Sequence, residues 1–319
     1  MENIVFLDRC TFGPSVELHR PGFAHEWGQY DRTVASEVAD RLAGATIAIT
    51  NKVPISAETL ADSRLAGLKM ISVAATGYDV VDVAACRDRG IAVYNVKGYA
   101  VNTVPEHTFG LILALRRQLI GYRNDVLDGR WQASKSFCFF SHEIRDLSDS
   151  TLGLIGAGAI GQRVGEIARA FGMKVLIAAH KGIEPQAGET EFNQVLQESD
   201  VISLHCPLND ATRNLISSAE FERMCRRPLI INTARGGIVN EPDLVVALEQ
   251  GKISGIGFDC LSVEPPADDH PLLRIADRPD VLITPHVSWS SQEAMATVWS
   301  EVIQNMQRFF EGDNTNRVS

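Results

Sequence analysis

The chain has 319 residues, a formal net charge of −10 at pH 7 and 45% hydrophobic residues. A length of this order predicts about two domains with full-sized cores, and the composition is ordinary for a soluble globular protein. The acidic balance argues against a nucleic-acid partner, because a negative surface repels phosphate backbones. No apolar run reaches the length of a membrane span and the N-terminus shows no signal peptide, so we expect a cytoplasmic protein without a membrane partner.

The six cysteines are scattered along the chain without a C-x-x-C pair. Reduced thiols in a cytosolic protein explain this spacing better than disulfides or a metal site do. We therefore expect no bound metal, and the spacing assigns no function to Cys10, Cys86, Cys138, Cys206, Cys225 or Cys260.

The first hundred residues alternate short apolar runs with helical segments. Helices are expected at Ala57–Leu65 and Val81–Arg89, and strands at Ile4–Leu7, Ile47–Thr50, Met70–Val73 and Ile91–Val93. This alternation is typical of a parallel sheet with helices on its faces. A turn after the third strand offers backbone N–H groups to an anion, although ordinary turn chemistry also explains its composition of Ala75, Thr76 and Gly77.

A long helix is expected after Val101. Asn102 or Thr103 can cap it, and Pro105 lies in its first turn. Its apolar residues cover more than one face, which indicates burial between domains or at a subunit contact.

The stretch from Thr151 to Phe171 predicts a strand, a glycine turn and a helix in direct succession. The turn has the G-x-G-x-x-G spacing, whose glycines permit a sharp turn, close approach of a pyrophosphate, and close packing of helix on strand. The helix N-terminus would face the phosphates. Because strands and a helix surround the motif, dinucleotide binding is favoured over a structural turn, with contacts from Gly156, Ala157, Gly158, Ala159, Ile160 and Gly161.

Further strands are expected at Lys174–Ala178, Val201–His205, Leu229–Asn232, Gly255–Phe258 and Val281–Thr284. With the strand before the glycine turn they make the number found in a full doubly wound dinucleotide-binding sheet. A last helix is expected at Ser291–Phe310. We predict an α/β protein in which residues 102–289 form a Rossmann domain with a doubly wound parallel sheet, and residues 1–101 and 290–319 form a discontinuous second domain.

Ligands of open α/β sheets lie beyond the carboxyl ends of the strands. Arg235 follows one predicted strand, Asp259 and Glu264 follow the next, and His286 follows the last. Each residue alone also fits a role without chemistry: Arg235 in a surface ion pair, Glu264 as a solvated loop residue, and His286 as a buried histidine. Together they supply a carboxylate binder, a proton donor and a partner for that donor, which favours an active site.

The sequence resembles the D-isomer-specific 2-hydroxyacid dehydrogenases over nearly its whole length, and within them the glycerate dehydrogenase/hydroxypyruvate reductase branch. The matching motifs are Gly98–Ala100 with Thr103–His107, the glycine turn, His205–Leu208, Ile231–Gly237, Asp259 with Glu264–Pro266, and Thr284–His286. The resemblance implies a flavodoxin-like substrate domain made from both chain ends, a Rossmann domain between them, and usually a homodimer.

The same resemblance implies the site residues. Arg235, Glu264 and His286 would be catalytic, and Arg235 and His286 would also bind substrate together with Ala75, Thr76 and Gly77. Asp259 would bind the nicotinamide amide. The other implied cofactor contacts beyond the glycine turn are Thr103, Cys206, Pro207, Thr212, Thr233 and Ala234.

The side chains suit this chemistry. A guanidinium can hold a carboxylate oxygen and the keto oxygen of a 2-keto acid bidentately. Hydride transfer to the keto carbon puts negative charge on its oxygen, which His286 as imidazolium can protonate, while Glu264 orients the ring and favours its charge.

We therefore expect an NAD(P)-dependent D-2-hydroxyacid dehydrogenase acting on hydroxypyruvate, glyoxylate or D-glycerate. The alternatives are a relative acting on a more apolar 2-keto acid and a non-catalytic dinucleotide-sensing binding protein. Trp289, Phe137 and Phe140 are candidates for the pocket or for the core.

The residues that would choose the cofactor depart from the usual NAD pattern. An NAD site places Asp or Glu about 20 residues past the first glycine, to bind the ribose 2′-hydroxyl. Here residues 177–182 contain no acid. His180 and Lys181 could instead pair with a 2′-phosphate, so NADP is favoured over NAD, the alternative being that both are exposed loop residues.

Overall fold

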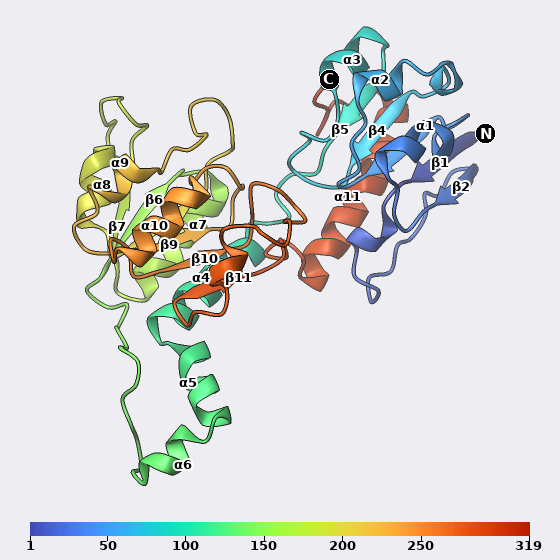
Figure 1. The fold of residues 1–319 in the computed structure, drawn as a ribbon. Helices are drawn as coiled ribbons and strands as arrows, with labels where there is room; N and C mark the ends of the chain where they lie inside the picture. Colours follow the sequence, from blue (N-terminus) through green and yellow to red (C-terminus); the bar gives the residue numbers. More distant parts are fainter. The chain divides into compact units, whose positions relative to one another are not determined.

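The computed structural model describes all 319 residues. The chain folds into two compact units (Figure 1). Unit 1 contains residues 1–100 and 289–319, and unit 2 contains residues 101–288. Each unit has one parallel sheet with helices packed on it, which is the α/β architecture that the sequence predicts. None of the helices combines the length and the apolar character that crossing a membrane requires.

Unit 1 contains a five-stranded sheet in the order β2-β1-β3-β4-β5. Four of its strands were predicted. The other, β2, lies at the edge of the sheet and has no fully buried residue, so no apolar run marks it in the sequence. The strands are β1 (Glu2–Phe6), β2 (His25–Gln29), β3 (Ile47–Thr50), β4 (Met70–Val73) and β5 (Ala92–Tyr94).

Side chains that alternate along each strand build a core on both faces of this sheet. The face that includes Ile4 and Phe6 is covered by α11 (Gln292–Glu311), whose Trp299 is fully buried with its ring 5.2 Å from that of Phe6. The opposite face, which includes Val5, is covered by the shorter helices α1 (Val38–Arg41), α2 (Ala57–Leu60) and α3 (Val83–Asp88).

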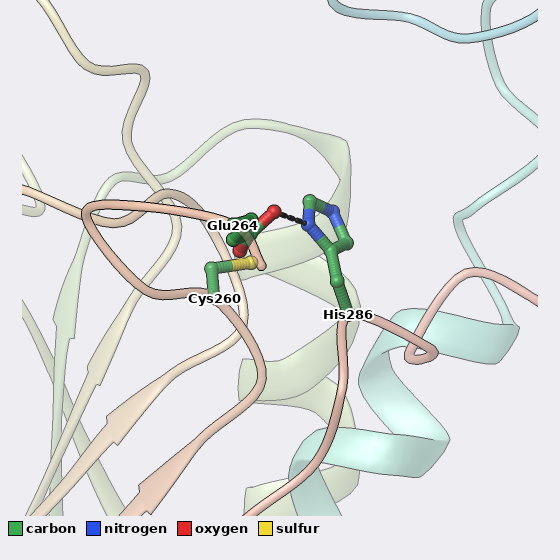
Figure 2. A group of neighbouring side chains, drawn as sticks. All are labelled: Cys260, Glu264 and His286. Carbon is green, nitrogen blue, oxygen red and sulfur yellow. Dashed lines mark hydrogen bonds and ion pairs between the residues drawn. The ribbon is translucent and has the colours of Figure 1, made fainter. Parts of the chain in front are cut away.

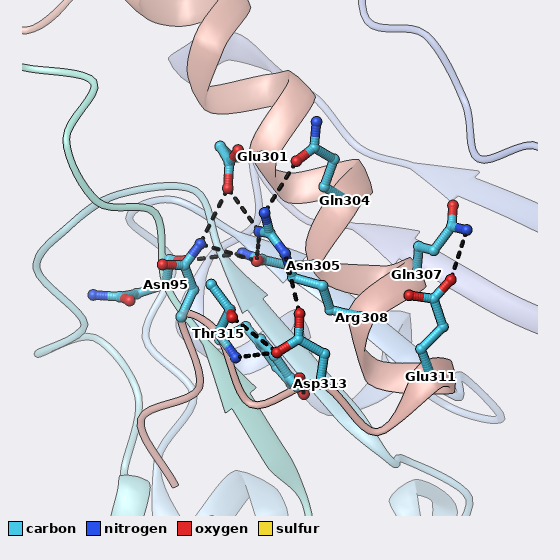
Figure 3. Close-up of polar contacts among 11 residues, drawn as sticks. Asn95, Glu301, Gln304, Asn305, Gln307, Arg308, Glu311, Asp313 and Thr315 are labelled. Atoms are coloured by element: carbon cyan, nitrogen blue, oxygen red, sulfur yellow. Dashed lines mark hydrogen bonds and ion pairs between the residues drawn. The ribbon is translucent and has the colours of Figure 1, made fainter.

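Polar side chains fix the C-terminal end of α11 to the sheet (Figure 3). Arg308 donates to Glu301 at 2.7 Å and to Asn305 at 2.9 Å. The fully buried Asn305 donates to the Asn95 carbonyl at 2.8 Å, and the Asn95 side chain donates to the Thr76 carbonyl at 2.8 Å. This chain of hydrogen bonds reaches the turn that was predicted to bind substrate.

Unit 2 contains a six-stranded sheet in the order β7-β6-β8-β9-β10-β11. The number of strands is as predicted. Counted along the chain the order is 2-1-3-4-5-6, because the third strand pairs with the first and not with the second. The winding reverses between β6 and β8, the position at which such sheets bind ligands. The strands are β6 (Thr151–Ile155), β7 (Lys174–Ile177), β8 (Val201–Leu204), β9 (Leu229–Asn232), β10 (Gly255–Phe258) and β11 (Val281–Ile283).

Helices cover both faces of this second sheet. On one face α4 (Thr103–Arg116) and α7 (Ala159–Ala170) share a core with β6, β8 and β9. The apolar residues of the predicted long helix are therefore largely buried within unit 2. The other face is covered by α8 (Phe192–Glu198), α9 (Ser218–Phe221) and α10 (Glu241–Glu249).

An arm, residues 119–146, projects from the rest of unit 2 (Figure 1). It contains α5 (Leu119–Leu127) and α6 (Arg130–Ser134). Phe137 and Phe140 lie in its returning segment and are 89% and 88% exposed, so neither is a core residue. The arm also exposes Leu119, Ile120, Val126, Leu127, Trp131 and Ile144.

Candidate active site

The glycine turn joins β6 directly to α7. Gly156 has φ +102°, a conformation that L side chains rarely adopt. A Cβ on Gly161 would lie 2.1 Å from the Gly156 carbonyl oxygen, so helix and turn touch through backbone alone. A Cβ on Gly158, by contrast, would meet nothing within 4 Å. The N-terminus of α7 therefore opens into free space at the middle glycine, as a bound pyrophosphate requires.

The segment after β8 passes beside this turn. A Cβ on Gly156 would lie 2.6 Å from the His205 carbonyl carbon and 2.7 Å from the Cys206 nitrogen. Burial lowers the pKa of His205 to about 4, so its ring is neutral near pH 7. Thr212 donates to the Pro207 carbonyl at 2.6 Å and so closes the turn that contains the predicted cofactor contacts Cys206 and Pro207.

The residues after β7 differ in what they offer to a cofactor. Ala179 is buried and His180 is the first exposed side chain. The Lys181 ammonium lies 2.9 Å from the carboxylate of Glu220, which is 1% exposed. That carboxylate also lies 3.5 Å from Arg223. The Lys181 charge is thus already paired within unit 2.

The turn after β9 presents Arg235. Its shape depends on the fully buried Asn232, whose amide donates to the Arg235 carbonyl at 2.8 Å and accepts from the Ala234 N–H at 3.1 Å. A Cβ on Gly236 would lie 1.9 Å from the Leu261 carbonyl oxygen. The Arg235 turn and the loop after β10 are therefore in direct backbone contact, which only glycine permits.

Glu264 and His286 form a hydrogen-bonded pair (Figure 2). Nδ1 of His286 lies 2.6 Å from Oε2 of Glu264, whose Oε1 accepts the Leu261 N–H at 2.9 Å. The His286 side chain is 23% exposed and the Glu264 side chain is 37% exposed, so a small molecule can reach them. Pairing through Nδ1 leaves Nε2 as the ring nitrogen that can face a substrate.

Asp259 clamps the loop that presents His286. Its carboxylate is buried and accepts from the Thr284 hydroxyl at 2.5 Å, the Val287 N–H at 2.9 Å and the Ser288 N–H at 2.8 Å. Between these donors His286 has φ +55°, which is uncommon for a residue with a Cβ. A carboxylate can accept about four hydrogen bonds, and these three donors use most of that capacity in a side chain that is 0% exposed.

A second buried carboxylate, Glu241, holds the loop that presents Glu264. Glu241 is the first residue of α10, and it accepts from the Ser262 N–H at 2.7 Å. Nε2 of the buried His270 lies 3.1 Å from the same carboxylate. This carboxylate–histidine pair holds the loop at Ser262 and was not predicted, because neither residue belongs to a motif at a strand end.

Threonines connect α4 to these loops. The Thr103 hydroxyl donates to the Ser288 carbonyl at 2.9 Å. The Thr233 hydroxyl, just after β9, lies 3.0 Å from that of Thr108. Both predicted cofactor contacts therefore lie on the same edge of the sheet as Asp259.

The predicted substrate turn belongs to unit 1, where it follows β4. Thr76 donates its hydroxyl to the Val96 carbonyl at 2.8 Å, and Ala75 accepts from the Val96 N–H at 3.0 Å. The backbone N–H groups of Thr76 and Gly77 donate to no other group of the chain. The turn is thus fixed by its neighbours while keeping N–H donors for an anion.

Arg235, Asp259 with Glu264, and His286 follow β9, β10 and β11, which are neighbours in the sheet. The structure therefore brings together at one edge the residues that the sequence placed after separate strands. A parallel sheet with a G-x-G-x-x-G turn between its first strand and the helix that follows is the arrangement of a dinucleotide-binding protein.

Comparison with known proteins identifies the family. The chain belongs to the D-isomer-specific 2-hydroxyacid dehydrogenases, since the model of the family's NAD binding domain matches residues 109–288. It is an oxidoreductase that transfers hydride between a nicotinamide dinucleotide and a small 2-keto or 2-hydroxy acid.

Individual relatives agree with this assignment. A glycerate dehydrogenase of Methylorubrum extorquens is 45% identical over 99% of both chains. A hydroxypyruvate reductase of Blautia hydrogenotrophica is 35% identical over 91% of both. Among solved structures, a D-lactate dehydrogenase of Aquifex aeolicus complexed with NAD and lactic acid is 28% identical, with a TM-score of 0.82 over 99% of both chains.

Removal of the Glu241 carboxylate should lower turnover without weakening dinucleotide binding. Glu241→Ala leaves the Ser262 N–H and Nε2 of His270 without their partner, and each unsatisfied group costs about 1–3 kcal/mol. We expect kcat to fall about tenfold, equivalent to about 1.4 kcal/mol in the barrier, because the Glu264 loop is no longer held. Steady-state kinetics and fluorescence titration with reduced dinucleotide measure the two effects.

Two further variants make this test specific. Glu241→Gln keeps an acceptor oxygen and should recover part of the lost kcat. Glu222→Ala removes an exposed carboxylate that pairs only with Lys252 among the ion pairs of the chain, and it should leave kcat unchanged. Equal losses of turnover and dinucleotide affinity in Glu241→Ala would show general damage to unit 2 instead.

Proposed function

We propose that this enzyme reduces hydroxypyruvate or glyoxylate, and in reverse oxidises D-glycerate. The observation that carries the proposal is the Glu264–His286 hydrogen bond at one sheet edge with the Arg235 turn. A guanidinium can bind a carboxylate, and a histidine paired with an acid can deliver a proton beside it. The choice of small hydroxylated acids is supported by the relatives named glycerate dehydrogenase and hydroxypyruvate reductase.

Each catalytic residue has one task in this proposal. Arg235 holds the carboxylate and keto oxygens of the acid in its planar fork, which fixes the keto carbon for attack. The nicotinamide, when bound, supplies the hydride. His286 gives a proton from Nε2 to the keto oxygen as that oxygen becomes an alcohol, and in the reverse direction it takes the proton back. Glu264 orients the ring through Nδ1.

The residues that would hold the dinucleotide fit the shape of unit 2. Gly156 to Gly161 and the N-terminus of α7 suit the pyrophosphate, as the open space at Gly158 supports. Asp259, just after β10, is the proposed ligand of the nicotinamide amide. Thr103, Cys206, Pro207, Thr212, Thr233 and Ala234 complete the proposed cofactor contacts.

We assign dinucleotide binding to unit 2 and part of the substrate binding to unit 1. The N–H groups of Thr76 and Gly77 support this division, because they can donate to the carboxylate of the acid. The cytoplasmic location expected from the sequence stays a prediction.

A panel of 2-keto acids tests the proposed substrates. Purified enzyme should reduce hydroxypyruvate and glyoxylate with a higher kcat/KM than it reduces 4-methyl-2-oxopentanoate, an acid with an apolar side chain, as measured by loss of reduced nicotinamide absorbance. Faster reduction of the apolar acid would support the more apolar alternative. Dinucleotide binding without turnover of any acid would support a sensing protein instead.

His286→Asn tests the proposed proton donor. The substitution removes the transferable proton, so kcat should fall by about two to four orders of magnitude, while the Kd for the dinucleotide stays nearly unchanged. His19→Asn, at an exposed histidine of unit 1, is the matched control and should be silent. Turnover by His286→Asn close to that of the unaltered enzyme would exclude this role.

We propose further that the enzyme prefers NADP to NAD. The support is the lack of an acid in residues 177–182, at the end of β7, which removes repulsion against a 2′-phosphate. Because the Lys181 ammonium is paired with Glu220, we assign the main phosphate contact to the exposed His180 and a lesser one to Lys181. The preference should then be modest and should weaken with salt, which screens exposed charges.

His180→Asp tests this preference. It places a carboxylate beside the ribose, where it can bind a 2′-hydroxyl and repel a 2′-phosphate, so the ratio of kcat/KM for NADPH to that for NADH should fall. The exposed position is preferable to Ala179, where a carboxylate would be buried. A ratio that already favours NADH in the unaltered enzyme, or one that His180→Asp leaves unchanged, would contradict the proposal.

We also propose that the enzyme is a homodimer held together by the arm. The support is the concentration of exposed apolar side chains there, with Phe137 and Phe140 each nearly 90% exposed. A surface of this kind is costly in water and marks an interaction site. The occupant we expect is the same arm of a second copy.

The double variant Phe137→Ser/Phe140→Ser should shift the enzyme from dimer to monomer. Serine removes the apolar area that association would bury, and light scattering coupled to size exclusion measures the mass. Val34→Ser, an exposed apolar residue of unit 1, is the control and should leave the mass unchanged. A monomeric mass for the unaltered enzyme would contradict the proposal directly.

A further inference from the structure

A cysteine lies beside the Glu264–His286 pair. Figure 2 shows its sulfur next to the Glu264 carboxylate, on the loop that follows β10. The potential ligand atoms of Cys260, Glu264 and His286 all lie within 4.8 Å of one another. A thiol, a carboxylate and an imidazole thus converge at the point where the proton donor is oriented.

We propose that Cys260, Glu264 and His286 form a binding site for a thiophilic divalent cation such as Zn²⁺. Thiolate, carboxylate and imidazole are the ligand types that bind zinc in proteins, and three protein ligands with one open position are usual for an accessible zinc ion. A thiolate and a carboxylate together carry −2, which balances the charge of the ion. The ion and its two anionic ligands would therefore have no net charge, and no other acid of the chain would be needed.

The three ligand atoms, now within 4.8 Å of one another, would each have to move by about 1 Å to bind one ion. Zinc bonds of about 2.0–2.3 Å in a tetrahedral arrangement separate neighbouring ligand atoms by about 3.3–3.6 Å. The Nδ1–Oε2 pair, now at 2.6 Å, must open by less than about 1 Å for an ion to enter between them. Cys260 is 1% exposed and so forms the inner side of the site, whereas Glu264 and His286 are partly exposed and leave an entry path.

The ion would inhibit the enzyme. A metal on Nδ1 replaces the hydrogen bond from His286 to Glu264, and it binds imidazole in its neutral form, so the ring can no longer act as the proton donor. This consequence rests on the proposed role of His286, whereas binding of the ion does not.

Cobalt provides a test of the site that is independent of turnover. Co²⁺ added to the full-length enzyme in a thiol-free reductant should produce a thiolate-to-cobalt charge-transfer absorption in the near ultraviolet. Cys260→Ala should abolish the absorption, and Cys225→Ala, at an exposed cysteine elsewhere, should keep it. Absence of the absorption in the unaltered enzyme, or its persistence in Cys260→Ala, would overturn the proposal.

Zinc inhibition tests whether the proposed metal site affects turnover. Zn²⁺ should inhibit keto-acid reduction reversibly, with recovery on addition of a chelator. In Cys260→Ala the inhibitory concentration should rise at least tenfold, because loss of a direct ligand exceeds the roughly 10–100-fold typical of an outer partner. If Cys260→Ala does not fold, Cys260→Ser replaces it, with the same expected rise. Inhibition equal in variant and unaltered enzyme would overturn the proposal, while cobalt binding without any turnover would contradict only the proposed function.

Discussion

Buried carboxylates that hold backbone N–H groups are the interactions on which this site depends. Asp259 accepts from Val287 and Ser288 and so fixes His286 in a left-handed conformation that it would not adopt unaided. Glu241 does the same for the Ser262 loop. A buried carboxylate is costly unless donors surround it, so each loop stabilises its carboxylate and each carboxylate stabilises its loop. The exposed, reactive side chains are thus positioned by acids that take no part in the chemistry.

The sequence predicts much of this because a parallel sheet converts chain order into spatial proximity. Arg235, Asp259 and His286 follow three apolar runs, and once those runs pair as β9, β10 and β11 their carboxyl ends must meet. The prediction weakens where burial is mixed, as in the edge strand β2, which lacks an apolar run. The sequence also leaves the strand order of unit 2 open, because the pairing of β8 with β6 is set by packing and not by any local pattern.

Side-chain partnerships were the least predictable feature. Lys181 reads as an available cation in the sequence, yet its partner Glu220 lies 39 positions further along, and their contact exists only once α9 packs on the sheet. Glu241 and His270 are hidden for the same reason, since a pair 29 positions apart leaves no periodic signal. Sequence motifs identify groups that can react, whereas the groups that restrain them become visible only in the folded chain.

The arrangement around His286 carries a physical conflict. A proton donor needs a negative partner on one ring nitrogen, and Glu264 supplies it through Nδ1 at 2.6 Å. The same carboxylate and nitrogen, with the Cys260 sulfur close by, are also good metal ligands. What favours the proton over an ion is the short direct contact between Glu264 and His286, which leaves no room for a cation until the pair opens. Asp259 and Glu241, by fixing both loops, therefore resist the separation that an ion would require, and the stiffness that supports proton transfer also limits competition from metals.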